Sequence, residues 1–145
     1  MKRRTIARLY WGLTGLFCLL MLADGAAGLL LEKNGQEAMR QLGYPAYVML
    51  ITGAAKILGA LALLQPRFRT LTEWAFAGFA IDFIGAAAST AFAGMGLPGM
   101  APALVMLAVL FGLYFLWKQH LAAARPAAIG TVEVAAGYEP LRAAA

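Results

Sequence analysis

The sequence predicts an all-α integral membrane protein, a four-helix bundle with both termini in the cytoplasm. Of its 145 residues, 62% are hydrophobic and 13% are charged, whereas soluble domains contain roughly 45 to 50% apolar and about 25% charged residues. Four stretches approach the roughly 20 apolar residues that a helix needs to cross a bilayer. They are residues 9–31, 46–64, 73–93 and 102–119. These spans leave almost no room for a soluble domain, so residues 1–120 are expected to form one transmembrane domain.

The first span, residues 9–31, follows a basic start. A basic head, an apolar middle and small residues such as Ala23 and Gly25 are also typical of a cleaved secretory signal peptide. The apolar character resumes at Ala26 and continues through Leu31. The run is therefore long enough to span the membrane and to be retained.

A short amphipathic helix is expected between the first two spans, over about residues 36–42. Gly43 and Pro45 follow it. Because proline is tolerated in the first turn of a helix and disrupts the helix interior, Pro45 also marks the start of the second span, residues 46–64.

The third and fourth spans are marked by different boundary signals. Thr70 and Glu73 have the spacing of a capping box, which predicts the start of the third span. A glycine- and proline-rich stretch predicts a tight turn before the fourth span. It contains Gly94, Gly96, Pro98, Gly99 and Pro102. Residues 121–145 are rich in alanine with scattered proline and glycine, and we expect a flexible cytoplasmic tail.

The lysine and arginine residues predict the orientation, because positive residues are retained on the cytoplasmic side of a membrane. Lys33 and Arg40 fall on one side of the predicted bundle and nine basic residues fall on the other. The nine are Lys2, Arg3, Arg4, Arg8, Arg67, Arg69, Lys118, Arg125 and Arg142. Both termini should therefore be cytoplasmic.

Three ionisable residues lie inside the predicted spans. With a rise of about 1.5 Å per residue, Lys56 lies roughly 12 Å and Asp82 roughly 13 to 14 Å from the cytoplasmic end of their helices. Asp24 lies about 22 Å in by the same count. We therefore predict that Lys56 meets Asp82 directly, and that Asp24 lies nearer the outer surface, where water can solvate it.

Insertion energies favour a paired Lys56 over one exposed to lipid. A lysine at a helix centre costs roughly 2.5 to 3.5 kcal/mol to insert, and the eight Leu, Ile and Val residues of the second span together return only roughly 2.4 to 4.8 kcal/mol. That helix is marginal alone and should depend on its neighbours.

Small and polar residues mark the helix faces that should surround this centre. Gly78, Asp82, Gly85 and Ser89 are spaced to share one face of the third span, and Thr52 shares a face with Lys56. A further stripe beside Asp24 includes Gly25 and Gly28. Small residues let helices approach in lipid, and polar residues bridge them. Intramembrane ionisable residues are functional candidates, but such a pair can also serve only to fix helix order and register.

Three segments resemble the DoxX-like family of small bacterial four-helix membrane proteins. They are LGYPAY at residues 42–47, AKILGALALL at 55–64 and EWAFAGFAIDFIGAAAS at 73–89, within a likeness that extends from Tyr10 to His120. The resemblance implies a multi-pass protein of the bacterial cytoplasmic membrane. It also implies that Lys56, Glu73 and Asp82 occupy positions where these residue types recur in the family. Founding members are subunits associated with a thiosulfate:quinone oxidoreductase, and other relatives accompany redox enzymes.

Three functions follow as hypotheses. The first is an accessory subunit of a membrane redox or stress-related assembly, with a polar intramembrane centre at Lys56 and Asp82 and with a quinone as the candidate cofactor. The second is an assembly or scaffold factor for another membrane protein. The third is a small transporter or proton pathway in which Asp24, Lys56 and Asp82 form a ladder across the membrane. The expected partners are the lipid bilayer and another membrane protein or redox enzyme subunit.

Other function classes lack their characteristic residues in this sequence. Cys18 is the single cysteine and His120 the single histidine, so a Cys/His metal cluster is excluded. No nucleophile accompanies a base, and no glycine-rich phosphate loop follows a strand, which argues against catalysis by the isolated chain. Nothing in the sequence supports nucleic-acid binding.

Overall fold

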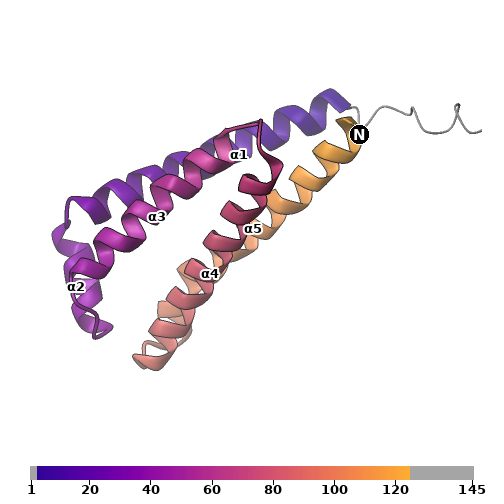
Figure 1. Ribbon diagram of the computed structural model, residues 1–145. Helices are drawn as coiled ribbons and strands as arrows, with labels where there is room; N and C mark the ends of the chain where they lie inside the picture. The colour runs from indigo at the N-terminus through magenta and orange to yellow at the C-terminus, as the bar shows by residue number, and fades with distance from the viewer. Residues whose placement is uncertain (1–2, 125–145) are drawn as a thin grey trace, which may run out of the picture.

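The structure, a computed structural model, describes residues 3–124, which form five helices and no strand (Figure 1). The helices are α1 (Arg3–Leu29), α2 (Lys33–Gln41), α3 (Tyr47–Leu64), α4 (Arg69–Phe92) and α5 (Gly96–Ala124). All of them except α2 are long and apolar enough to cross a membrane. This confirms the prediction of a helical membrane protein. The predicted tail lies outside the described residues, except for its first four residues, 121–124, which belong to α5.

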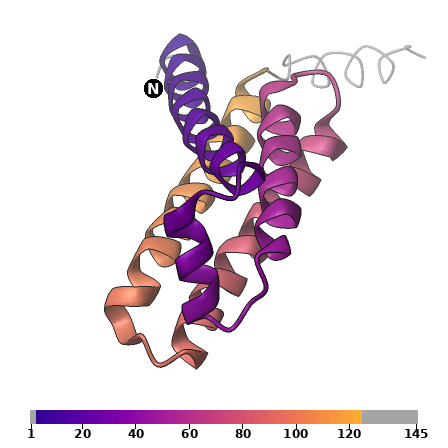
Figure 2. The ribbon, with the colours of Figure 1, turned by 90° about the vertical axis from the view of Figure 1, so that its left-hand side faces the viewer.

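The four long helices form two antiparallel pairs. α1 packs along α3, and α4 packs along α5, and these are the two most extensive helix contacts. Figure 1 shows that the pairs converge where α1 begins and α5 ends, and diverge toward α2. Figure 2, which looks toward the divergent end, shows α2 in front of the long helices. The bundle is therefore splayed, a feature that the sequence analysis did not predict.

Aromatic side chains join the two pairs through a buried cluster. Phe17 of α1 packs edge-on against two rings of α4, with centroid distances of 5.3 Å to Phe79 and 6.3 Å to Phe83. All three are at most 5% exposed. Phe76 of α4 packs in turn against Trp117 of α5 at 5.7 Å. Aromatic pairs add specific edge and face contacts to the area that they bury, so this cluster fixes how α1 meets α4 and α5.

The contact between α1 and α3 depends on three glycines. A Cβ atom on Gly53 would lie 2.7 Å from the carbonyl oxygen of Gly25, and one on Gly28 would lie 2.9 Å from the carbonyl oxygen of Met49. Such distances leave no room for any side chain, so the two backbones touch at these positions. This is the close approach that the small-residue stripe of the first span predicted.

Two helices begin before the membrane spans predicted for them, because polar residues extend these helices. α1 begins at Arg3 and not at residue 9, since the basic residues before the apolar run are good helix formers. α4 begins at Arg69 and not at residue 73. Its N-cap is Phe68, without a side-chain cap, so the predicted capping box does not define the start. Gln65 stabilises the connection instead: its Oε1 accepts from the Phe68 N–H at 2.7 Å, and its Nε2 donates to the Phe68 carbonyl at 2.8 Å.

The glycine- and proline-rich turn is also shorter than predicted. Gly94 and Gly96 have positive φ angles of 73° and 63° and form the turn, but α5 begins at Gly96 and contains Pro102. Pro102 lacks the N–H that would bond the carbonyl four residues earlier, a defect that membrane helices tolerate near neighbouring helices. The helix α5 therefore begins before the predicted span 102–119. The short helix is also displaced, at Lys33–Gln41 and not 36–42, because Glu32 caps it by accepting from the Gly35 N–H at 3.1 Å.

Candidate functional site

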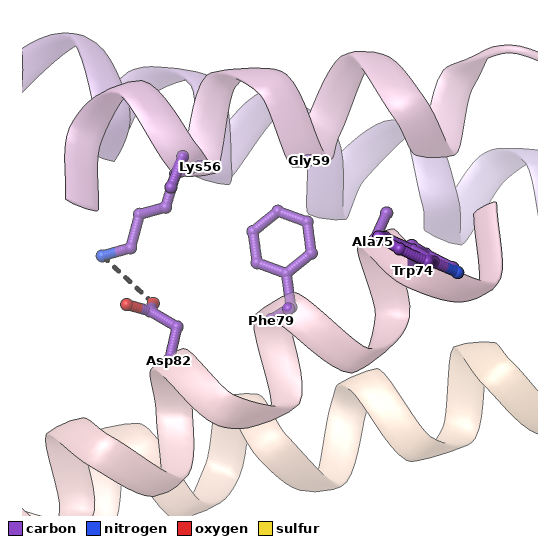
Figure 3. Close-up of a pocket in the computed structure, with 8 residues that line it drawn as sticks. Lys56, Gly59, Trp74, Ala75, Phe79 and Asp82 are labelled. Atoms are coloured by element: carbon purple, nitrogen blue, oxygen red, sulfur yellow. Dashed lines mark ion pairs between the residues drawn. The ribbon is translucent and has the colours of Figure 1, made fainter. Parts of the chain in front are cut away.

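The structure brings Lys56, Asp24 and Asp82 together from three different helices. The Lys56 Nζ of α3 donates a hydrogen bond to Asp24 Oδ2 of α1 at 2.6 Å. The same nitrogen lies 3.6 Å from Asp82 Oδ2 of α4 (Figure 3). We call these three side chains the ion triad. It links both helix pairs, since α1 and α3 belong to one pair and α4 to the other.

The position of Asp24 differs from the prediction. Asp24 was expected above the Lys56 and Asp82 pair, yet it makes the shorter of the two contacts to Lys56. The depth estimate counted only the backbone rise, whereas a lysine side chain can extend well away from the level of its Cα. The side chain of Asp24 is 56% exposed, against 27% for Asp82 and 21% for Lys56. Asp24 is therefore both bonded to Lys56 and open to its surroundings.

Two close packing contacts position the triad. The touching backbones at Gly25 and Gly53 hold α1 against α3 next to Asp24 and Lys56. On the other side of Lys56, the ring of Phe79 occupies the space that a side chain on Gly59 would fill, because a Cβ there would lie 2.8 Å from the ring. Gly59 and Phe79 are each three residues from their triad member, so this contact brings α4 close enough for Asp82 to reach Lys56.

The triad contains two carboxylates and one ammonium, a formal charge of −1. An ammonium group has three N–H donors, and one of them is hydrogen-bonded to the Asp24 carboxylate. Asp82, at 3.6 Å, lies within ion-pair distance but beyond hydrogen-bond distance. At least one donor of Lys56 therefore remains for another acceptor. Charged groups interact more strongly in a medium of low dielectric constant than in water, so an acceptor bound at this position would meet a strong hydrogen-bond donor.

Lys56 lies on the walls of two hollows. The first, of about 190 Å³, is bounded by α3 and α4, and we call it the lateral hollow (Figure 3). Its lining includes Lys56, Gly59, Trp74, Gly78, Phe79 and Asp82. The second, of about 250 Å³, lies beneath α2 and includes Asp24, Glu32, Thr52 and Lys56. The triad can therefore be approached from two directions.

The other predicted polar and small residues do not all join the triad. Thr52 donates to the carbonyl of Val48 in its own helix at 3.0 Å. Ser89 donates to the carbonyl of Gly85 at 2.8 Å, and its oxygen lies 2.9 Å from the hydroxyl oxygen of Tyr44. Ser89 thus ties the connection between α2 and α3 to α4. Gly85 has nothing within 4 Å of a built Cβ, so it is not a close helix contact.

Glu73 belongs to a separate ion pair. Its carboxylate lies 2.8 Å from the Nζ of Lys118 on α5. That nitrogen also lies over the rings of Tyr114 and Trp117, at 5.3 Å and 4.9 Å from their centroids. Glu73 was expected to flank the polar centre, and no partner was predicted for Lys118. The signal that could have joined them is depth, since both residues were expected at the cytoplasmic end of their spans.

Metal binding has no support within residues 3–124, where no group of His, Cys, Asp and Glu side chains could hold an ion. Cys18 is buried, and its thiol lies 3.5 Å from the carbonyl oxygen of Ala60. His120 stacks on Tyr10, with ring centroids 5.3 Å apart.

The comparisons with known proteins identify one family. The sequence model of the DoxX-like family matches residues 12–113, a segment that contains the whole ion triad. No curated protein and no solved structure matches this chain.

Proposed function

This chain belongs to the DoxX-like family, and on that premise we propose that it is an accessory subunit of a membrane redox or stress-related assembly. In this proposal the protein lies in the bacterial cytoplasmic membrane. The ion triad of Lys56, Asp24 and Asp82 holds the head group of a lipid-soluble hydrogen-bond acceptor, for which a quinone is the candidate.

The observation that carries this proposal is the position of the Lys56 ammonium on the wall of the lateral hollow. Trp74, at the rim of the same hollow, is 76% exposed, while Phe79 inside it is 3% exposed. The hollow therefore combines a charged donor, a buried ring and an open side between α3 and α4. A lipid-soluble molecule could enter from the bilayer through that side without crossing water.

The size of the hollow limits what it can hold. Pockets for whole drug-sized ligands measure roughly 300 to 1,000 Å³, and the lateral hollow measures about 190 Å³. It suits a single ring, with an isoprenoid tail left among the lipid chains. Lys56 would donate to a carbonyl oxygen of such a ring, and Asp82 would accept from a hydroxyl group of its reduced form.

The test measures which lipid-soluble molecules remain with the protein after gentle extraction. We expect the wild type to retain a quinone, and we expect the amount retained by Lys56→Met to be at least about tenfold lower. Gly78→Leu should lose as much, because a Cβ on Gly78 meets nothing within 4 Å and the longer side chain would fill the hollow. Gly85→Leu is the matched control, since Gly85 is equally unobstructed and does not line the hollow.

Two results would reject this function. One is wild-type protein, extracted from quinone-containing membranes, that carries no quinone. The other is equal retention by the wild type and by the Lys56 and Gly78 variants.

A second candidate, an assembly or scaffold factor, is favoured by an apolar groove between α1 and α5. This groove measures about 550 Å³ and is lined only by apolar residues, among them Leu16, Leu20, Val109 and Gly112. Such a groove could accept a helix of another membrane protein. Crosslinking from cysteines placed at Leu16 and Val109 in native membranes would capture that partner. A captured partner, together with wild-type protein that carries no quinone, would favour this function over the first.

The third hypothesis, a proton pathway or small transporter, is less well supported by the geometry. The contacts of Lys56 with Asp24 and Asp82 gather the three residues at one place and do not spread them across the membrane. This hypothesis would require that the reconstituted protein carries protons or a solute across liposome membranes, and that Asp24→Asn abolishes this flux.

A further inference from the structure

We propose that the convergent end of the bundle contains a binding site for the phosphate group of an anionic phospholipid. The site is independent of the ion triad and of its proposed quinone. It lies where α1 begins, where α3 connects to α4, and where α5 ends.

A hollow of about 190 Å³ lies at this end, and we call it the end hollow. α1 contributes Tyr10 and Trp11, and α5 contributes Trp117 and His120. The start of α4 contributes Arg69. Three separate segments therefore surround one space, which makes it a defined site and not a flat charged surface.

The end hollow offers polar groups without partners in the described part of the chain. Arg69 is exposed and forms no ion pair with any residue in 3–124. The ring of His120 lies nearly parallel to that of Tyr10, at an interplanar angle of 15° and a centroid distance of 5.3 Å. Tyr10 is only 2% exposed, so it gives His120 a fixed support. A guanidinium and a supported imidazole beside one hollow suit an oxyanion.

The connection that carries Arg69 is held in place. Gln65 bonds both the N–H and the carbonyl of Phe68, the residue before Arg69. Thr72, one turn after Phe68, is 4% exposed, and its hydroxyl lies 3.3 Å from the same carbonyl. Arg69 therefore begins α4 from a fixed backbone, so that binding at its side chain does not also require the connection to become ordered.

The charge balance of the two ends favours an anion here. Arg4, Arg8, Arg67 and Arg69 form no ion pairs within residues 3–124, and Lys118 pairs with Glu73. At the opposite end, Lys33 and Arg40 are matched by Glu32 and Glu37, and Arg40 pairs with Glu37 at 3.3 Å. The convergent end therefore carries the excess positive charge, which attracts anionic head groups.

A lipid phosphate fits this location better than a soluble one. Exposed apolar residues adjoin basic residues in the sequence at this end, since Leu9, 40% exposed, follows Arg8, and Phe68, 59% exposed, precedes Arg69. Trp11 is 39% exposed and is of a residue type enriched at the membrane interface. These side chains would contact acyl chains while Arg69 binds two phosphate oxygens, the fork geometry that a guanidinium favours.

The test titrates the delipidated full-length protein in detergent with phosphatidylglycerol and with phosphatidylcholine, and counts bound lipids by native mass spectrometry. We expect one phosphatidylglycerol to bind at least about tenfold more tightly than phosphatidylcholine. Arg69→Gln should weaken that binding about tenfold, as for the loss of one charge-assisted contact. Arg67→Gln removes the same charge two residues away, outside the end hollow, and should weaken it less than about twofold.

Further measurements distinguish a specific lipid site from general charge attraction and from a site for soluble phosphate. Arg69→Lys keeps the charge without the fork and should give an intermediate affinity, provided that circular dichroism shows the same helix content in all variants. Equal weakening by Arg67→Gln and Arg69→Gln, equal binding of the two lipids, or displacement of the lipid by equimolar inorganic phosphate would overturn the proposal. Quinone retention by Arg69→Gln should be unchanged, which keeps this test apart from that of the proposed function.

Discussion

The ammonium group of Lys56 is paired with two carboxylates instead of being surrounded by water. The nearer, Asp24, is 56% exposed, and the farther, Asp82, is 27% exposed. Because the two acids share one counter-ion, the members of the triad are not equivalent. Loss of either acid still leaves Lys56 one partner, whereas loss of Lys56 leaves two carboxylates facing each other without a cation. Lys56 is therefore the residue on which the stability of the triad depends most.

The Glu73 and Lys118 pair should contribute far less to stability than the triad does. Both side chains are nearly half exposed, at 48% and 46%, and exposed ion pairs contribute little to stability. We expect Glu73→Gln to lower the free energy of unfolding in detergent far less than Lys56→Met does. Denaturant titration followed by circular dichroism would measure it. A loss as large as that of Lys56→Met would show that this pair is structural.

The sequence could identify the members of the triad but not its closest contact. Lys56 and Asp82 were matched because their depths agree, and the backbone rise is enough to show that. Asp24 was placed too far away because side-chain reach and the position of α1 relative to α3 set that contact. Neither quantity can be obtained from the rise per residue. Glu73 and Lys118 were expected at the same depth, but depth alone does not show that α4 packs on α5.

At the scale of the elements, glycines decide which helices touch. Gly25, Gly28 and Gly53 bring α1 and α3 into backbone contact, while Gly85 of α4 meets nothing within 4 Å. The same residue type therefore has opposite roles in different helices. In α1 and α3 it permits close packing, whereas in α4 it leaves open space and lowers the helix propensity without a compensating contact.

Alanine substitutions should separate these two roles. Gly53→Ala places a Cβ at 2.7 Å from the backbone oxygen of Gly25, so α1 must move away from α3. We expect a loss of about 1 to 3 kcal/mol in the free energy of unfolding, as for other overpacked sites. Gly85→Ala should be neutral or stabilising by up to about 1 kcal/mol, because alanine is the better helix former.

Denaturant titration would give the free energy of unfolding of both alanine variants. Equal effects of the two substitutions would contradict the assigned close contact between α1 and α3.

The existence of every helix was predictable, but several helix ends were not. Long apolar runs defined the four spans because lipid requires a continuous helix. Ends depend on local bonds that the composition does not show, such as those from Gln65 to Phe68, which replaced the predicted capping box. Pro102 lies inside α5 because a membrane helix tolerates a missing hydrogen bond that would disrupt most soluble helices.

The two helix pairs of the molecule diverge (Figure 1), and no feature of the sequence indicated this divergence. In a soluble protein the apolar face of each helix marks the core. In lipid the outer faces are as apolar as the inner ones, so the pattern does not show how far two helices separate. Large apolar side chains are indeed exposed on α5, including Val105, Phe111 and Phe115 at 57 to 64%. Charge predicts the orientation, which the apolar pattern does not address.

The predicted orientation can be tested with introduced cysteines. Lys33→Cys lies at the divergent end and Arg67→Cys at the convergent end, and both positions are exposed. Cys18 is 1% exposed, so the native thiol should react little. In intact cells we expect a membrane-impermeant maleimide to label Lys33→Cys at once and Arg67→Cys only after permeabilisation. The reverse pattern would invert the assigned topology, and labelling of both in intact cells would show mixed insertion.

We infer that Asp24 and Asp82 together stabilise Lys56 within the membrane. The most direct measurement is the free energy of unfolding, in detergent, of Lys56→Met, of Asp24→Asn with Asp82→Asn, and of the triple variant. Lys56→Met should cost about 3 kcal/mol because it strands two carboxylates, and the triple variant should recover most of that loss. If the triple variant instead loses the sum of the two separate losses, the three side chains do not interact and the account is wrong.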